Sequence, residues 1–190
     1  MDLNEARQIV KKRLKIARYE HTLRVEETAV ELAKRYKEST EKAALAGILH
    51  DIAKCDPTHQ LKDSIYFYQL PKTLFNYNKE LWHGPVGARV VEKDYGVTDQ
   101  DVLNAIYYHT TAREKMSKLE KIVFVADYIE PGRKFPGVNE VREIVNKDLD
   151  LAAQKVLKNT IIHLVNKDIK VYPDTFLAYN QFTNSMRGVD

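Results

Sequence analysis

The chain has a single cysteine, Cys55, among its 190 residues, so no internal disulfide can form. This sparse use of cysteine fits the reducing cytoplasm. Seven glycines and six prolines leave little material for the many turns of an all-β fold. No apolar run approaches the ~20 residues that span a bilayer. The N-terminal stretch lacks the apolar centre and the cleavage site of a signal peptide. We therefore expect a cytoplasmic protein with no membrane partner.

The sequence also lacks a strong excess of charge of one sign. Its net charge is +3, and the basic residues are scattered rather than clustered. A nucleic-acid-binding domain usually carries a concentrated basic patch, so no nucleic-acid partner is expected. The mild positive balance suits a pocket for small anions.

Apolar residues recur with a helical period along nearly the whole chain. In the segment 19–36, for example, Leu23, Val25, Ala29 and Leu32 follow mainly one stripe. The expected helices are an amphipathic one at the N-terminus and others at roughly 19–36, 41–53, 59–70, 82–96, 99–109, 121–129, from 139, 149–166 and 174–186. The expected caps are Ser39 or Thr40, Gly96, Thr98 and Ser117. The interpretation is one all-α domain that covers residues 1–190.

The run AGILHDIAK, residues 46–54, places an imidazole beside a carboxylate in an apolar helical context. A buried carboxylate is costly unless it is paired or bound to a metal. Similar residues recur near helix ends or inside apolar stretches: His21, His50, Asp51, His83, His109 and Asp127. Each has small or apolar residues one helical turn away, so these side chains should face the core and converge there.

The mixture of imidazoles and carboxylates suits Fe, Mn, Zn, Co or Ni. Six such ligands exceed what one catalytic ion needs, and two ions about 3.5–4 Å apart would use them all, with an aspartate between them. A structural zinc site would more often use cysteines. The alternative is that these residues form hydrogen-bonded polar features of the core. His59 and His163 lack ligand-type neighbours, and we expect them to lie outside any site.

The order His…His-Asp…Asp on helices resembles the HD-domain superfamily of metal-dependent phosphohydrolases. The stretches WHGPVGA and YYHTTAREKMSKLEKIVFVADYIEPGRKFPGV are similar to its YqeK-like branch, the bacterial symmetrical diadenosine tetraphosphate hydrolases. The similarity runs through roughly residues 18–180. The resemblance implies the HD helical bundle and hydrolysis of a dinucleoside polyphosphate in the middle, with two ADP as products.

The resemblance also implies roles for the ligand-type residues. His21, His50, Asp51 and Asp127 would bind a first divalent metal, commonly iron in this family. His83 and His109 would bind a second ion with Asp51 as the bridge, or would contact the substrate phosphates when that site is empty. Some family members also carry a label that links them to NAD metabolism.

Cations placed beside these ligands are candidates for contacts with phosphate. Lys54 follows Asp51 by three residues, and Arg133 lies in the Gly/Pro-rich loop 130–137 just after Asp127. Arg24 lies one turn after His21. A lone basic residue is usually a solvated surface charge, but position beside a ligand favours Lys54 and Arg133. Lys54 or a protonated His109 would offset the charge of the leaving ADP.

The nucleotide also needs contacts for its base and sugar. The break KVYPDT, residues 170–175, could present Tyr172 for stacking, or it could be a plain turn between helices. The expected contacts there are Lys170, Tyr172 and Thr175, together with Thr110 beside His109.

Three other functions stay open at the level of sequence. The chain could be another HD phosphohydrolase acting on nucleoside mono- or triphosphates or on alarmones. It could perform diiron oxygenase chemistry with the same ligands, although Lys54 and Arg133 favour phosphate. It could also be a module that binds nucleotide and metal without turnover. The sequence is compatible with a monomer or a homodimer.

Overall fold

The computed structural model describes residues 1–187. Within that range the chain forms α-helices and two short 3₁₀ helices, and no strand. The helices are α1 (Leu3–Arg13), α2 (Ile16–Tyr36), α3 (Thr40–Leu49), α4 (Thr58–Phe67), η1 (Lys72–Asn76), η2 (Lys79–Leu81), α5 (His83–Lys93), α6 (Gln100–Tyr108), α7 (Lys118–Ile129), α8 (Val138–Ile144), α9 (Leu149–Val165) and α10 (Pro173–Arg187). The predicted all-α class is confirmed.

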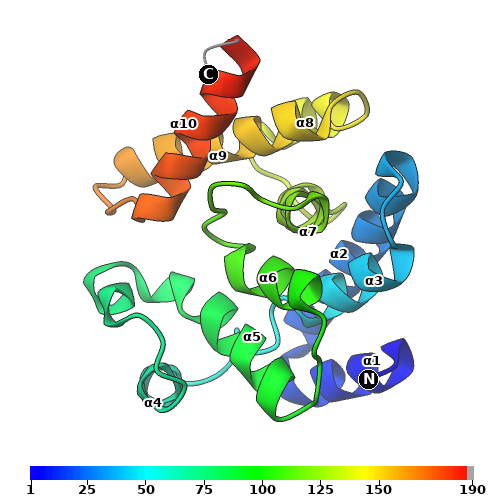
Figure 1. Ribbon diagram of the computed structural model, residues 1–190, viewed down its shortest axis with the longest axis vertical. Coiled ribbons are helices and arrows are strands. Elements are labelled where there is room, and N and C mark those ends of the chain that lie inside the picture. Colours follow the sequence, from blue (N-terminus) through cyan, green and yellow to red (C-terminus); the bar gives the residue numbers. More distant parts are fainter. Residues whose placement is uncertain (188–190) are drawn as a thin grey trace.

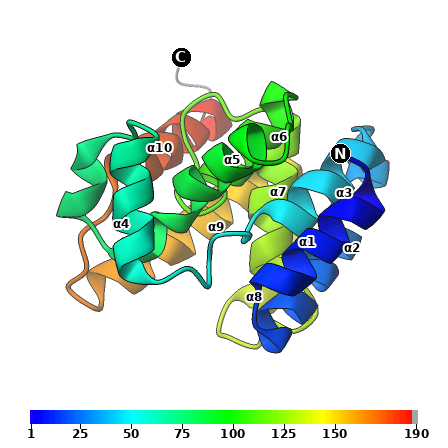
Figure 2. The same cartoon turned by 90° about the horizontal axis from the view of Figure 1, so that it is seen from below.

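Helix α7 lies near the middle of the molecule (Figures 1 and 2). It packs against α2, α3, α6 and α9, while α10 packs on α9 and α4 packs on α5. The side chains of Ile48, Ile106, Ile122 and Leu157 are fully buried at these contacts. None of the helices in the described range is long and apolar enough to cross a membrane.

Helices α2 and α3 approach each other closely at Gly47. A Cβ atom at this position would lie 2.9 Å from the backbone Cα of Glu26, so a larger residue would push the two helices apart. The close approach matters because His21 lies on α2 and His50 directly follows α3. Glycine therefore sets the spacing of two of the predicted ligands.

The predicted helix 41–53 is shorter than expected, because α3 ends at Leu49. After it the backbone tightens, with Ile52 N–H donating to Leu49 O at 3.0 Å and Lys54 N–H donating to Asp51 O at 2.8 Å. These bonds span three residues rather than four, as in a 3₁₀ turn. The pair His50-Asp51 thus lies where the regular helix gives way to turns. Likewise α4 ends at Phe67, before the expected residue 70.

Two predicted caps are wrong by one or a few residues. Asp99 rather than Thr98 caps α6, because its carboxylate accepts from the backbone N–H groups of Asp101 and Val102. The same carboxylate pairs with Lys42 Nζ at 2.8 Å, a contact that Thr98 could not make. Helix α5 ends at Lys93, and Gly96 lies three residues further on, where φ is +69°. The glycine serves the following turn, since that φ is unfavourable for other residues.

The other expected caps are confirmed. Ser39 and Ser117 accept from the backbone N–H groups of Lys42 and Glu120. The side chain of Glu120, however, pairs with Arg113 instead of returning to the backbone of Ser117. Only half of the expected capping box therefore forms.

Candidate metal centre

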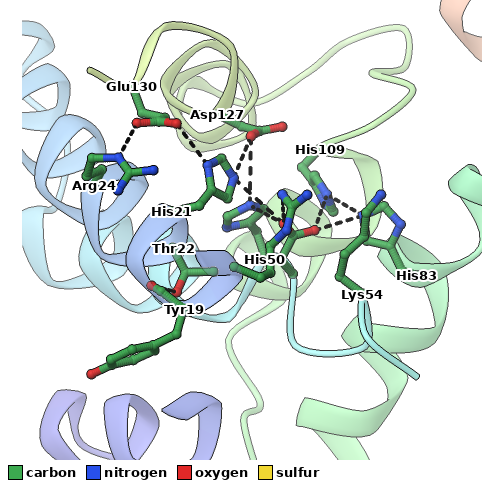
Figure 3. Close-up of polar contacts among 12 residues, drawn as sticks. Tyr19, His21, Thr22, Arg24, His50, Lys54, His83, His109, Asp127 and Glu130 are labelled. Atoms are coloured by element: carbon green, nitrogen blue, oxygen red, sulfur yellow. Dashed lines mark hydrogen bonds and ion pairs between the residues drawn. The ribbon is translucent and has the colours of Figure 1, made fainter. Parts of the chain in front are cut away.

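The structure brings all six predicted ligand residues together, and Figure 3 shows the four histidines and Asp127 among them. They come from separate elements: His21 from α2, His50 and Asp51 from the turn after α3, His83 from the start of α5, His109 from the end of α6 and Asp127 from α7. All are buried except Asp127, whose side chain is 21% exposed. His21 lies in the second turn of α2, because that helix begins at Ile16 rather than near residue 19 as expected.

Four of these residues form a first group. His21 Nε2 lies 3.0 Å from Asp127 Oδ1, and His50 Nε2 lies 3.3 Å from Asp51 Oδ2. The longer separations in the group are 3.7 Å between His21 Nε2 and Asp51 Oδ2, and 3.9 Å between His50 Nε2 and Asp127 Oδ1. Both Nε2 atoms are buried and have no hydrogen-bond partner among the described residues.

The other ring nitrogens explain why these Nε2 atoms are available as ligands. His50 Nδ1 donates to Gly47 O at 2.6 Å, and His109 Nδ1 donates to Ile106 O at 2.7 Å. His21 Nδ1 lies 3.1 Å from a carboxylate oxygen of Glu130. Carbonyl oxygens only accept, so the proton of neutral His50 and His109 resides on Nδ1, while His21 faces a carboxylate at both nitrogens, Glu130 at Nδ1 and Asp127 at Nε2. The Nε2 atoms of His50 and His109 then direct a lone pair into the cluster, as metal-binding histidines do, and His21 Nε2 does the same when its ring proton is on Nδ1.

A second group shares Asp51 with the first. Its Oδ1 atom lies 3.0 Å from His83 Nε2 and 3.6 Å from His109 Nε2, and the two Nε2 atoms are 3.0 Å apart. The Oδ2 atom of the same carboxylate faces His21 and His50. One aspartate thus offers one oxygen to each group. This donor set, with its unpartnered buried nitrogens, fits one or two borderline divalent ions.

The charge states of Asp51 and His83 suit metal binding at neutral pH, whereas at His50 the effect of burial is outweighed by Asp51 and Asp127, which raise the pKa of that imidazole in the absence of a metal. Burial alone would raise the pKa of Asp51, but the imidazole of His50 and contacts with His109 and His83 hold that pKa well below its usual range. Burial lowers the pKa of His83 to about 4 against the opposing effect of Asp51. A ligand must be a deprotonated carboxylate or a neutral imidazole. Both residues meet that condition.

Neutral His83 makes the metal-free protein sensitive to acid. The pKa of His83 is about 4 in the folded protein and about 6.5 in the unfolded chain. Between these two pH values the unfolded chain binds more protons than the folded protein, so the stability of the fold rises with pH. Between pH 7 and pH 5 this residue should cost the folded state about 2 kcal/mol. Urea unfolding in chelator should show a smaller drop for His83→Gln than for wild type. Equal drops would contradict a neutral His83.

The predicted cations differ in their positions. Arg133 donates hydrogen bonds to the carboxylate and to the backbone carbonyl oxygen of Asp127. These contacts place its guanidinium beside the first group. Lys54 Nζ donates to Glu80 Oε2 at 2.9 Å, and its side chain is largely buried. Arg24 Nε donates to Glu130 Oε2 at 2.6 Å. Each therefore has a carboxylate partner, but only the partner of Arg133 is a predicted ligand.

The segment 170–175 packs against η1. The Tyr172 ring contacts that of Tyr77 with centroids 5.0 Å apart, and Lys170 Nζ donates to Asn76 O at 3.3 Å. Thr175 is buried, while the Thr110 Oγ1 atom is buried without a partner among the described residues. These four residues stay predicted nucleotide contacts.

Two residues at the centre were missed by the sequence analysis. Arg18 Nη1 donates to Asp51 Oδ2 at 2.8 Å, and Glu130 contacts His21 and Arg24. A signal existed for Arg18, because it precedes His21 by three residues and so lies on the same face of α2. Glu130 follows Asp127 by three residues, but it lies beyond the last residue of α7, so the helical period does not place it. His59 and His163 are exposed, as expected.

The HD domain model matches residues 18–132, a range that contains every predicted ligand. The chain belongs to the HD-domain family. It is 48% identical over 180 residues to a symmetrical bis(5'-nucleosyl)-tetraphosphatase of Bacillus subtilis (strain 168), covering 95% of this chain and 97% of that protein. A protein of the same name from Staphylococcus aureus (strain NCTC 8325 / PS 47) is 42% identical over 187 residues, with 97% and 96% covered.

A solved structure extends the similarity to the fold. It is the crystal structure of a "predicted HD superfamily hydrolase involved in NAD metabolism" from Clostridium acetobutylicum. Its TM-score with this HD-domain protein is 0.92 at 38% sequence identity, over 97% of this chain and 98% of the other. The resemblance to the HD superfamily that the sequence indicated is confirmed.

Proposed function

We propose that this HD-domain protein hydrolyses diadenosine tetraphosphate symmetrically to two ADP. The relatives named symmetrical bis(5'-nucleosyl)-tetraphosphatases, which match over nearly the full length, support this activity. The observation that carries it is the position of Asp51, whose two oxygens face two separate groups of ligands. An enzyme that cleaves a phosphoanhydride gains from cations on both sides of the reacting phosphorus.

In this proposal His21, His50, Asp51 and Asp127 hold a first divalent ion. Asp51, His83 and His109 hold a second when it is present. Iron is the proposed metal, with Mn, Co, Ni or Zn as alternatives, because nitrogen and oxygen ligands suit all of them. When bound, such ions make hydroxide available near neutral pH and offset charge on phosphate oxygens.

The remaining residues orient the phosphates and the base. Arg133, beside Asp127, binds a phosphate of the ADP unit that stays, since a guanidinium binds phosphate oxygens bidentately. Arg18 lies against Asp51 Oδ2 and offers a second guanidinium on the α2 side. Lys54, or His109 when it is protonated, offsets the charge on the leaving ADP. Thr110, Lys170, Tyr172 and Thr175 contact the sugar and base, with the Tyr172 ring as the stacking surface.

We place the enzyme in the cytoplasm, as a monomer or homodimer that acts on a dinucleoside polyphosphate and has no nucleic-acid partner. A single cysteine and a modest net charge support this setting. The substrate carries several negative charges, and the cations gathered beside the ligand cluster complement them.

The position of cleavage tests the proposed activity. Diadenosine tetraphosphate incubated with Fe²⁺-, Mn²⁺- or Co²⁺-loaded enzyme in ¹⁸O-water should give two ADP, one of them with ¹⁸O on its β-phosphate. Water attacks one β-phosphorus, and the bridging oxygen leaves with the other ADP. Chromatography and mass spectrometry of the first turnovers measure this.

Equal ATP and AMP would contradict symmetrical cleavage, and brisk hydrolysis of mononucleotides alone would favour another HD phosphohydrolase. Binding of nucleotide and metal with no turnover would identify a binding module.

A further inference from the structure

Glu130 is a buried carboxylate at the edge of the metal centre. It is 2% exposed, and it accepts three hydrogen bonds. The donors are His21 Nδ1 at 3.1 Å, Arg24 Nε at 2.6 Å and the backbone N–H of Gly132 at 2.5 Å. Figure 3 shows Glu130 between Arg24 and His21, on the side of His21 away from the ligand cluster. Its two oxygens thus join helix α2 to the turn that follows α7.

The contact with His21 determines what that imidazole presents to a metal. A proton held on Nδ1 by this carboxylate leaves the lone pair on Nε2 free for a metal, against the competition of the Asp127 carboxylate, whose Oδ1 lies 3.0 Å from Nε2. The carboxylate also limits rotation of the ring. Such partners of metal-binding histidines fix the tautomer and increase the ligand's basicity.

The contact with Gly132 ties the same carboxylate to the turn that carries Arg133. A Cβ atom on Gly132 would lie 2.7 Å from Arg24 Nη2, so the turn closes tightly over the Arg24–Glu130 pair. Arg133 N–H donates to Glu130 O at 2.9 Å, which continues the turn. Glu130 therefore contacts a predicted ligand on one side and supports the predicted phosphate-binding residue on the other.

A second buried glutamate, at the opposite end of α7, separates this role from simple ion pairing. Glu120, on α7, is 1% exposed and is paired with Arg113 by hydrogen bonds of 2.6–3.3 Å. It contacts none of the predicted ligands. Both glutamates are buried partners of an arginine, but only Glu130 also contacts an imidazole of the cluster.

We propose that Glu130 is a positioning residue: it holds His21 in the Nδ1–H tautomer and orients Nε2 towards the first metal. The inference rests on the proposed metal site at His21. Outer partners of this kind typically change metal affinity 10- to 100-fold when removed. The proposal predicts a loss of that size in Glu130→Gln, which keeps the shape of the side chain but removes its charge.

Calorimetric titration of metal-depleted, untagged protein with Co²⁺ tests the proposal. The variants are Glu130→Gln, the matched control Glu120→Gln, and His21→Ala as a reference for the first site. Glu130→Gln should bind Co²⁺ at the first site about 10- to 100-fold more weakly than wild type. Glu120→Gln should bind as wild type does, although thermal unfolding should show that it is destabilised. Equal affinities for wild type and Glu130→Gln, or equal losses in both glutamate variants, would overturn the proposal.

Two further results keep this test separate from that of the metal site itself. If His21→Ala binds Co²⁺ as wild type does, the proposed first site is wrong, and the role of Glu130 is wrong with it. Nitrogen-15 shifts of the His21 ring in metal-free protein give a readout that needs no metal. Wild type should show mainly the Nδ1–H tautomer, although Asp127 faces Nε2, and Glu130→Gln should show a mixture with less Nδ1–H. If Glu130→Gln does not fold, Glu130→Asp, whose carboxylate is withdrawn from His21, should give the mixture. An Nε2–H tautomer in wild type would overturn the proposal.

Discussion

Replacement of Asp51 by alanine should lower kcat for diadenosine tetraphosphate by more than about 100-fold, or roughly 2.7 kcal/mol of transition-state stabilisation. The reason is that Asp51 alone contributes to both ligand groups, with Oδ2 near His21 and His50 and Oδ1 3.0 Å from His83. Its loss removes a ligand from each proposed ion and leaves the Arg18 guanidinium without its carboxylate partner. Steady-state rates at saturating Mn²⁺ measure the effect.

The controls for Asp51→Ala are two histidines outside the cluster. His59 and His163 are both exposed, so His59→Ala and His163→Ala should keep nearly the full rate. Asp51→Asn should fail as alanine does, because an amide nitrogen cannot replace the second ligand oxygen. A variant that lacks Asp51 and keeps more than about a tenth of the wild-type kcat, a loss below 1.4 kcal/mol, would contradict the bridging role.

Removal of Arg133 should weaken ADP binding by roughly 1.5–3 kcal/mol, the value of a hydrogen bond to a charged group. That is about a 10- to 150-fold rise in Kd. In the structure its guanidinium pairs with Asp127, a proposed ligand of the first ion, so in the proposed site it is close to a phosphate held by that ion. Titration of Arg133→Ala with ADP at saturating Mn²⁺ measures the loss and separates it from any change in metal affinity.

Two other variants make the Arg133 experiment specific. Arg133→Lys should recover only part of the affinity, because an ammonium cannot bind phosphate with the planar pair of N–H groups that arginine has. Arg89, which pairs with Glu92 on α5 at 2.6 Å, provides a surface control, and Arg89→Ala should bind ADP as wild type does. Wild-type affinity in Arg133→Ala would remove this residue from the phosphate site.

The fold class and the identity of the clustered side chains could be predicted from the sequence because both depend on local patterns. The 3.6-residue period places apolar residues on one face of each helix. His109 and Asp127 share that face with Ile106 and Val123, one turn away. Residues on the buried face of several helices must meet inside the bundle, so their convergence follows without knowledge of the helix order.

Helix boundaries were predicted less well, because tertiary contacts choose between adjacent candidates. Thr98 and Asp99 are both acceptable caps by residue type. Asp99 is used because it also pairs with Lys42 from α3. Similarly, Ile52 and Ala53 suited a helix that continued past Leu49. The backbone instead forms tighter turns at His50 and Asp51, where both side chains point into the cluster.

By itself the sequence determined that helices would bring imidazoles and carboxylates together in a core. Only the tertiary structure decided which carboxylate oxygen faces which histidines. It also decided which further side chains form hydrogen bonds with these ligands. The split of Asp51 between two groups and the contact of Glu130 with His21, 109 residues away in sequence, depend on helix rotation and on side-chain rotamers. A helical period specifies which face of each helix is buried, but it leaves the rotation of one helix against another to packing. Those rotations place each ligand atom within reach of its partners.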